Sequence, residues 1–264
     1  MQISNLLCRW RSKRVKRLLV ILGLAINVGL FVVLIQSHLS VNARLGSQVL
    51  AAEPAISVGA IAPPKLHPLP PTLAQWQDPQ NSGDYFSSVK PTEVGYLVWS
   101  KFPIKVYIDP GSSSTKQAQA WFNSVFQAVQ EWNVYLPLVV VEQPEVADIT
   151  ILRSPPPLAA SPDGKIPHAR SAETRYELYI SKAVPGVLSH RCTILLSPSQ
   201  TNNYLQAAAR HELGHALGIW GHSPVKTDAL YFAQVRNPPP ISPRDMNTLK
   251  RVYEQPTRLG WSVQ

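Results

Sequence analysis

The chain has 264 residues, 45% of them hydrophobic, so it is long enough for one sizeable domain and an additional shorter segment. Its formal net charge of +9 at first suggests a nucleic-acid partner, but six of the 25 basic residues lie within the first 17 positions. The other 19 basic residues stand against 16 acidic residues and form no dense basic stripe interleaved with aromatic residues. We therefore expect no nucleic-acid-binding surface.

The N-terminal part of the sequence has the pattern of a membrane anchor. Residues 1–17 are strongly basic, and residues 18–35 are uncharged and apolar. A helix of that length spans about 27 Å, close to the ~30 Å of a bilayer core. We expect a single transmembrane helix with the basic segment in the cytoplasm and the rest of the chain outside it. The alternative is a cleaved secretory signal with a small-residue site at 41–43, but the apolar run exceeds the usual ~7–15 residues.

Residues 36–88 are predicted to form a stalk or linker. Seven prolines occur between positions 54 and 79, which favours extended, polyproline-like backbone over a packed core. From residue 89 the apolar spacing changes, so residues 89–264 are predicted to form the folded domain. The two cysteines, Cys8 and Cys192, would lie on opposite sides of the membrane and could not pair, and Cys192 is expected to be buried packing.

The first half of this domain is predicted to contain three strands and a helix. Residues 104–109 alternate, are rich in β-forming residue types and end at Asp-Pro-Gly, which is typical of a strand. Across residues 116–135 large apolar side chains recur at helical spacing, which predicts an amphipathic helix, with serines 112–114 as candidate N-caps. Residues 138–142 and 148–152 are predicted to be two further short strands.

The second half is predicted to contain two strands and two helices. Residues 176–181 and 192–196 have the pattern of strands, and residues 203–218 that of a long helix. A Ser-Pro pair at 242–243 and Asp245 open a last helix, because serine can cap it, proline suits its first turn and the acid complements its dipole. Strands and helices in this order indicate an α+β domain.

A metal-binding pattern lies within the long helix at 203–218. His211 and His215 are four residues apart, so they lie on one helix face and both imidazoles can bind one ion. Glu212 follows the first histidine, and its carboxylate can reach the open side of the ion and act as general base on a metal-activated water. The bare pattern HExxH also occurs by chance, as two surface histidines with an acid between them.

The residues after this helix supply a third candidate ligand. Gly218 lies where the helix must end, and glycine tolerates the left-handed conformation of such a turn. Gly221 gives a second flexible point, and His222 follows on a chain that has turned back toward the helix. We therefore expect a Zn2+ site with His211, His215 and His222 as its ligands.

Residues 211–223, HELGHALGIWGHS, resemble the zinc signature of the metzincin proteases, and most closely that of the matrixins, HExxHxxGxxH. The third histidine falls one residue late, because Gly221 occupies its expected place and His222 follows. The segment is also similar to that of predicted zinc-dependent proteases of cyanobacteria, which carry the same GIWGHS variant and a similar NPPPISPRD segment. The resemblance implies that the inserted residue is absorbed in the turn.

The resemblance also implies a metzincin-like catalytic domain with a twisted, mostly parallel sheet of about five strands and three helices. Outside the zinc segment the similarity is weaker, and in all it extends over residues 89–253. Matrixins place a methionine-tyrosine pair in a tight turn beneath the metal. Here Leu230 and Tyr231 occupy that place, and leucine has a volume similar to that of methionine. His168 and His190 are expected to be ordinary loop and strand histidines rather than ligands of a structural zinc.

The sequence therefore predicts a zinc-dependent endopeptidase that takes a peptide or protein substrate along the sheet edge. By the resemblance, residues 232–241 would wall the pocket for the side chain that follows the cut bond. The alternative is a non-catalytic zinc-binding module, tethered to the membrane and acting in interaction or assembly, which Leu230 and the late His222 support. A zinc protease that takes a distant glutamate as third ligand would have to use Glu254, but the short interval after Gly218 favours His222.

Overall fold

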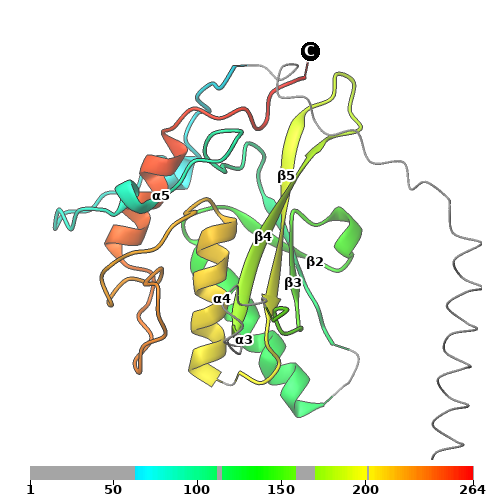
Figure 1. The fold of residues 1–264 in the computed structure, drawn as a ribbon, viewed down its shortest axis with the longest axis vertical. Coiled ribbons are helices and arrows are strands. Elements are labelled where there is room, and N and C mark those ends of the chain that lie inside the picture. Colours follow the sequence, from blue (N-terminus) through cyan, green and yellow to red (C-terminus); the bar gives the residue numbers. More distant parts are fainter. Residues whose placement is uncertain (1–62, 112–114, 159–169, 201, 264) are drawn as a thin grey trace, which may run out of the picture. The chain divides into compact units, whose positions relative to one another are not determined.

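The computed structural model describes residues 63–111, 115–158, 170–200 and 202–263 (Figure 1). Within these ranges no helix has both the length and the apolar character needed to cross a bilayer. The predicted membrane segment, residues 18–35, lies outside them, as does His168.

A five-stranded sheet forms the centre of the described domain. Its strands are β1 (Ile104–Ile108), β2 (Leu138–Val141), β3 (Ile149–Leu152), β4 (Ala172–Ile180) and β5 (Leu188–Leu196). They lie in the order β2-β1-β3-β5-β4; the first four are parallel, and β4 pairs antiparallel with β5 at one edge. The predicted α+β class with a mostly parallel sheet of about five strands is confirmed.

Strands β4 and β5 each begin four residues earlier than the sequence predicts. The early part of β4 carries charged side chains such as Glu173 and Arg175, and that of β5 carries His190 and Arg191, so neither has a clear apolar alternation. The two strands nevertheless pair without interruption from Ala172 opposite Leu196 to Ile180 opposite Leu188. Cross-strand pairing therefore overrides weak local β-propensity here.

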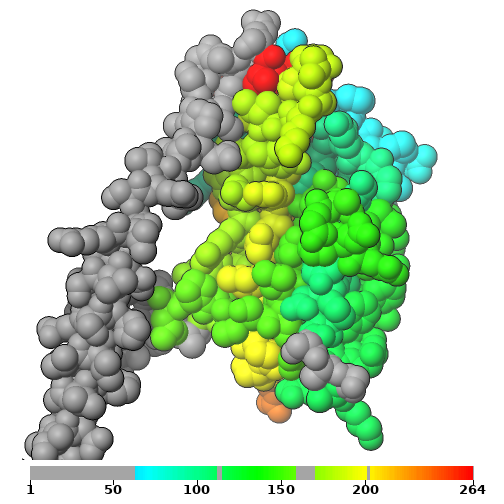
Figure 2. All heavy atoms as spheres, turned by 90° about the vertical axis from the view of Figure 1, so that its right-hand side faces the viewer, coloured from blue at the N-terminus to red at the C-terminus, as the bar shows by residue number. Residues whose placement is uncertain are grey.

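Three long helices accompany the sheet: α3 (Lys116–Asn133), α4 (Asn202–Ala216) and α5 (Pro243–Tyr253). Helices α3 and α4 pack together and cover one face of the sheet (Figure 1). Figure 2 shows the molecule from the side of the sheet, where the β4–β5 hairpin runs along the surface. Within α3 the side chains of Trp121 and Trp132 are buried, as predicted. Its N-cap is Thr115, which accepts the Ala118 N–H at 3.2 Å.

Helix α5 begins as the sequence predicts. The Ser242 side chain accepts the Asp245 N–H, and the Asp245 carboxylate accepts the Ser242 N–H at 2.8 Å, which completes a capping box. Cys192 is buried and free, as expected for a packing residue.

The segment before the predicted domain packs against it. We call residues 65–88 the N-terminal strap; it contains the one-turn helix α2 (Pro71–Ala74) and the 3-10 turn η2 (Phe86–Ser88). Leu73 and Tyr85 of the strap are buried in the main hydrophobic core, and in Figure 1 the cyan strap lies beside α5. The sequence assigns these residues to the linker, whereas the structure makes them part of the folded domain.

Candidate metal centre

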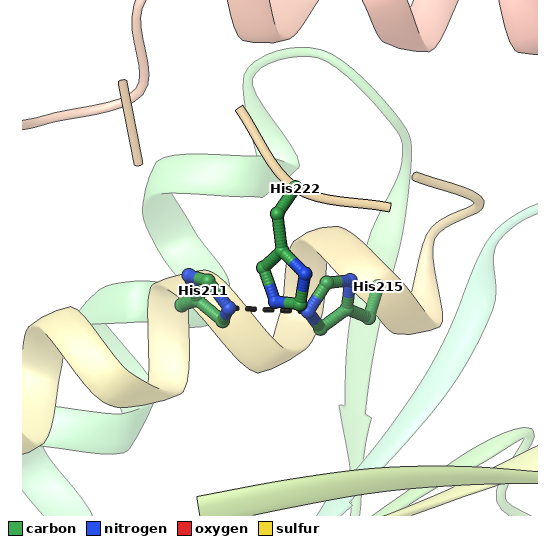
Figure 3. Close-up of side chains that lie close together, drawn as sticks. All are labelled: His211, His215 and His222. Carbon is green, nitrogen blue, oxygen red and sulfur yellow. Dashed lines mark hydrogen bonds between the residues drawn. The ribbon is translucent and has the colours of Figure 1, made fainter. Parts of the chain in front are cut away.

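Three histidine side chains converge at the C-terminal half of α4. His211 and His215 project from successive turns of the helix, and His222 reaches them from the segment that follows it (Figure 3). One ligand nitrogen from each ring lies within 4.8 Å of the other two, which is close enough for the three to hold a metal ion. The structure therefore brings together the three residues that the sequence proposes as ligands.

The helix-borne pair already has a separation suited to zinc. The Nε2 atoms of His211 and His215 lie 3.1 Å apart. Two nitrogens bound to zinc at 2.0–2.1 Å in tetrahedral geometry are about 3.3 Å apart. The two rings stand nearly perpendicular, with an interplanar angle of 88°.

Backbone carbonyls fix the orientation of both rings. His211 Nδ1 lies 2.9 Å from the Ala229 carbonyl oxygen, and His215 Nδ1 lies 2.7 Å from the Ile219 carbonyl oxygen. A carbonyl oxygen only accepts hydrogen bonds, so each Nδ1 carries the proton and each Nε2 of a neutral ring keeps its lone pair for a metal. Such outer contacts are what metal-binding histidines require.

The end of α4 is built to place the Ile219 carbonyl over His215. Gly218 N–H bonds to His215 O, and Ile219 N–H bonds to Gly214 O, each at 3.0 Å. This pair of bonds is a Schellman motif, and Gly218 has the positive φ of 131° that the motif's turn demands. The turn predicted from Gly218 is thus present, and it also orients a candidate ligand.

Gly221 has a different role from the predicted flexible point. Its φ is not positive; instead, a Cβ at this position would collide with the Ser88 carbonyl group of η2. Only glycine leaves room for the strap to lie against the chain just before His222. Lys90 N–H, just after the strap, also bonds to the Trp220 carbonyl at 3.0 Å and helps to hold the segment that carries the third histidine.

Burial keeps two of the histidines neutral. Desolvation lowers the pKa of His215 well below its ordinary value, with neighbouring His211 adding to the shift. Desolvation and then His211 also lower the pKa of His222. A metal binds only the neutral imidazole, so these shifts favour metal binding at neutral pH.

Glu212 lies at the wall of a cavity of about 700 Å³ that the three histidines also line. The residue is only 8% exposed. Burial raises the pKa of its carboxyl group, while the electrostatic effect of His211 and a hydrogen bond from Thr174 oppose that rise. A partly desolvated carboxylate beside a metal site has the properties of a general base.

A tight turn containing Leu230 packs beneath the histidines. Leu230 is fully buried, and its methyl groups lie against Gly214 of α4. The turn is closed by a hydrogen bond of 2.8 Å from Ser223 N–H to the Leu230 carbonyl. Leu230 therefore packs beneath the helix that carries His211 and His215.

The buried carboxylate of Asp245 supports this turn, a role that the sequence did not indicate. It accepts the Ala229 N–H at 2.8 Å and the Tyr85 hydroxyl at 2.6 Å. Burial raises the pKa of Asp245, and these hydrogen bonds oppose the rise. Asp245 accepts the N–H of Ala229, and the carbonyl of the same residue orients His211, so Asp245 supports the metal site through Ala229. The capping motif predicted Asp245 at the helix start, but nothing local pointed to its distant partners.

The contact between Gly214 and Leu230 predicts the effect of a single methyl group. A Cβ on Gly214 would lie 2.6 Å from Leu230 Cδ2 and 3.1 Å from Trp132 Cζ2, and both neighbours are fully buried. We expect Gly214→Ala to lower the free energy of unfolding in chemical denaturation, because overpacking costs about 1–3 kcal/mol and outweighs the ~1 kcal/mol helix-propensity gain. The double variant with Leu230→Ala should show non-additive costs, since the new methyl fills part of the cavity. Simple stabilisation by Gly214→Ala would contradict this packing.

His190 takes no part in the candidate site. It is buried in β5, stacks on Trp99 with ring centroids 3.9 Å apart, and desolvation lowers its pKa to about 3. It is a neutral packing residue, as the sequence predicted for a strand histidine. Among the described residues, the metal-binding group contains neither His190 nor Glu254.

No protein-family model matches the chain, and no curated protein matches it either.

Proposed function

We propose that the chain is a metzincin-like zinc endopeptidase with His211, His215 and His222 as metal ligands and Glu212 as general base. The observation that carries the proposal is the convergence of three imidazoles and one buried carboxylate on a single cavity. Three ligands from the protein leave a tetrahedral metal with an open position, which is typical of catalytic rather than structural zinc sites.

The donor set fits zinc. It consists of three imidazole nitrogens; the outer contacts of His211 and His215 are already made, and the 3.1 Å separation of their Nε2 atoms suits a tetrahedral ion. When bound, zinc lowers the pKa of a water molecule to about 7 and polarises a carbonyl oxygen.

The protein's own residues would do the rest of the chemistry. Glu212 would take a proton from the attacking water and deliver it to the nitrogen of the leaving amine, so that the peptide bond is replaced by an acid and an amine. The substrate would lie along β4, because β4 is the edge strand beside α4 and, among the described residues, no further strand pairs with its outer side. Exposed Phe232 and neighbouring residues of the loop at 232–241 would wall one end of the cavity.

The proposal includes the predicted cellular setting. The apolar segment at 18–35 would anchor the chain in a membrane and place the protease domain on the extracytoplasmic side, with secretion after signal cleavage as the alternative. Placement among the metzincins rests on the signature at 211–223, the Gly218 turn and the packing of Leu230 beneath α4.

Metal content and proteolysis test the proposal together. The purified full chain should contain about one zinc and cleave an unfolded protein such as reduced casein. A chelator should abolish cleavage, and added zinc should restore it. A chain that retains zinc but cleaves no unfolded protein would instead support the non-catalytic interaction module. A chain that binds no zinc would contradict both functions.

A further inference from the structure

A threonine hydroxyl from the sheet holds the carboxylate of the proposed general base. Thr174 Oγ1 lies 2.6 Å from Glu212 Oε2 and 3.1 Å from the Glu212 carbonyl oxygen. The short contact has the length of a hydroxyl donating to a charged carboxylate. Within the described part of the chain, the Glu212 side chain makes no hydrogen bond to any side chain other than that of Thr174.

The two residues come from different elements that meet at the cavity. Thr174 lies on edge strand β4, and Glu212 lies on α4, which packs against that strand. Both residues line the cavity of about 700 Å³. The hydrogen bond therefore joins the strand proposed to bind substrate to the carboxylate proposed to move the proton.

We infer that Thr174 is a positioning residue for the proposed reaction: its hydroxyl holds Glu212 Oε2 and thereby aims Oε1 at the reacting water. The inference rests on the proposed peptidase function. The threonine hydroxyl has one proton to give, so it holds one of the two carboxylate oxygens. Among the described residues Oε1 has no side-chain hydrogen-bond partner, so it is the oxygen that we expect to accept the proton from water.

The choice of threonine suits this role. The last torsion of a glutamate side chain is broad, so an unheld carboxylate samples many orientations. Threonine is β-branched, which restricts rotation about its first torsion. A small displacement of a reacting group is enough to slow a reaction by orders of magnitude.

Two substitutions in the full chain separate positioning from packing. Thr174→Val keeps the shape and removes the hydroxyl, and Thr174→Ser keeps the hydroxyl. We expect Thr174→Val to retain zinc and lower kcat for a fluorogenic peptide by about 10–100-fold, with KM changed less than about two-fold. Thr174→Ser should recover most of kcat. Thr193→Val is the matched control, because Thr193 is a partly buried strand threonine on neighbouring β5.

A second readout does not depend on activity. The melting temperature of the metal-free chain should fall on Thr174→Val, and it should fall by less when Glu212 has already been changed to alanine, because the hydrogen bond is then absent. Equal falls in both backgrounds would overturn the pairing. An active parent whose kcat is unchanged by Thr174→Val would overturn the inference alone. An inactive, zinc-loaded parent that still shows the thermal coupling would overturn the proposed function and, with it, the catalytic role of the pair.

Discussion

Glu212→Gln is expected to remove peptide hydrolysis and leave the zinc in place. The amide has nearly the shape of the carboxylate and can still accept the Thr174 hydroxyl, so the fold around it should persist. It cannot take a proton from water, and general-base catalysis is typically worth about 10²–10⁴-fold. We therefore expect kcat to fall by about that factor, measured with a fluorogenic peptide, and zinc content by elemental analysis to stay near that of the parent.

Glu177→Gln is the matched control for this variant. Glu177 lies on β4 three residues beyond Thr174, and its 65%-exposed side chain pairs with Arg191 at the surface. Loss of that pair should cost at most ~1 kcal/mol of stability and leave kcat unchanged. Full activity in Glu212→Gln would remove the general base from the mechanism. Loss of zinc in the same variant would instead indicate that the carboxylate is itself a ligand.

Much of the fold and of the candidate site follows from local sequence. The spacing of His211 and His215 predicts their shared face because a helix imposes it regardless of surroundings. The Gly218 turn and the Ser242–Asp245 capping box are equally local, since the participating groups are within a few residues of one another. Each of these features depends on neighbouring residues alone, and each is present in the structure.

The parts that the sequence could not predict depend on distant contacts. Gly221 is needed because Ser88 of the strap lies against it, and 133 positions separate the two residues in the chain. Asp245 is buried because Tyr85 and the Ala229 amide satisfy its oxygens. A glycine or an aspartate has the same local preferences whether or not such partners exist, so neither role leaves a signal in a single sequence.

The position of His222 also depends on contacts between residues that are distant in the chain. Lys90, just after the strap, bonds to Trp220 before His222, and Leu230 in the following turn bonds to Ser223 after it. These contacts fix the chain on both sides of His222. The imidazole still lies within reach of the other two, with its ring centroid 4.8 Å from that of His215.

Because the strap belongs to the domain, a chain that begins at Val89 is expected not to fold. Such a truncation removes the buried side chains of Leu73 and Tyr85, each worth about 1.5–3 kcal/mol of apolar burial. It also removes the Tyr85 hydroxyl bond to Asp245, and a hydrogen bond to a charged group contributes about 1.5–3 kcal/mol. The combined loss is comparable with the 5–15 kcal/mol that stabilises a typical domain. Circular dichroism during urea titration should show no cooperative transition, in contrast to a chain that begins at residue 63.

A single substitution then tests whether the strap acts on the metal site or only on stability. Tyr85→Phe keeps the buried ring and removes the donor to Asp245, whose other contacts hold the Ala229 peptide that orients His211. We expect it to weaken zinc binding by up to about 10-fold, the lower end of what outer-shell changes cause. Tyr179→Phe is the control, because Tyr179 lies on β4 with its side chain partly exposed. Unchanged zinc affinity in Tyr85→Phe would confine the strap to a stabilising role. A cooperative, zinc-binding chain that begins at Val89 would show that the strap is dispensable, and the Gly221 contact with Ser88 would then have no consequence for the position of His222.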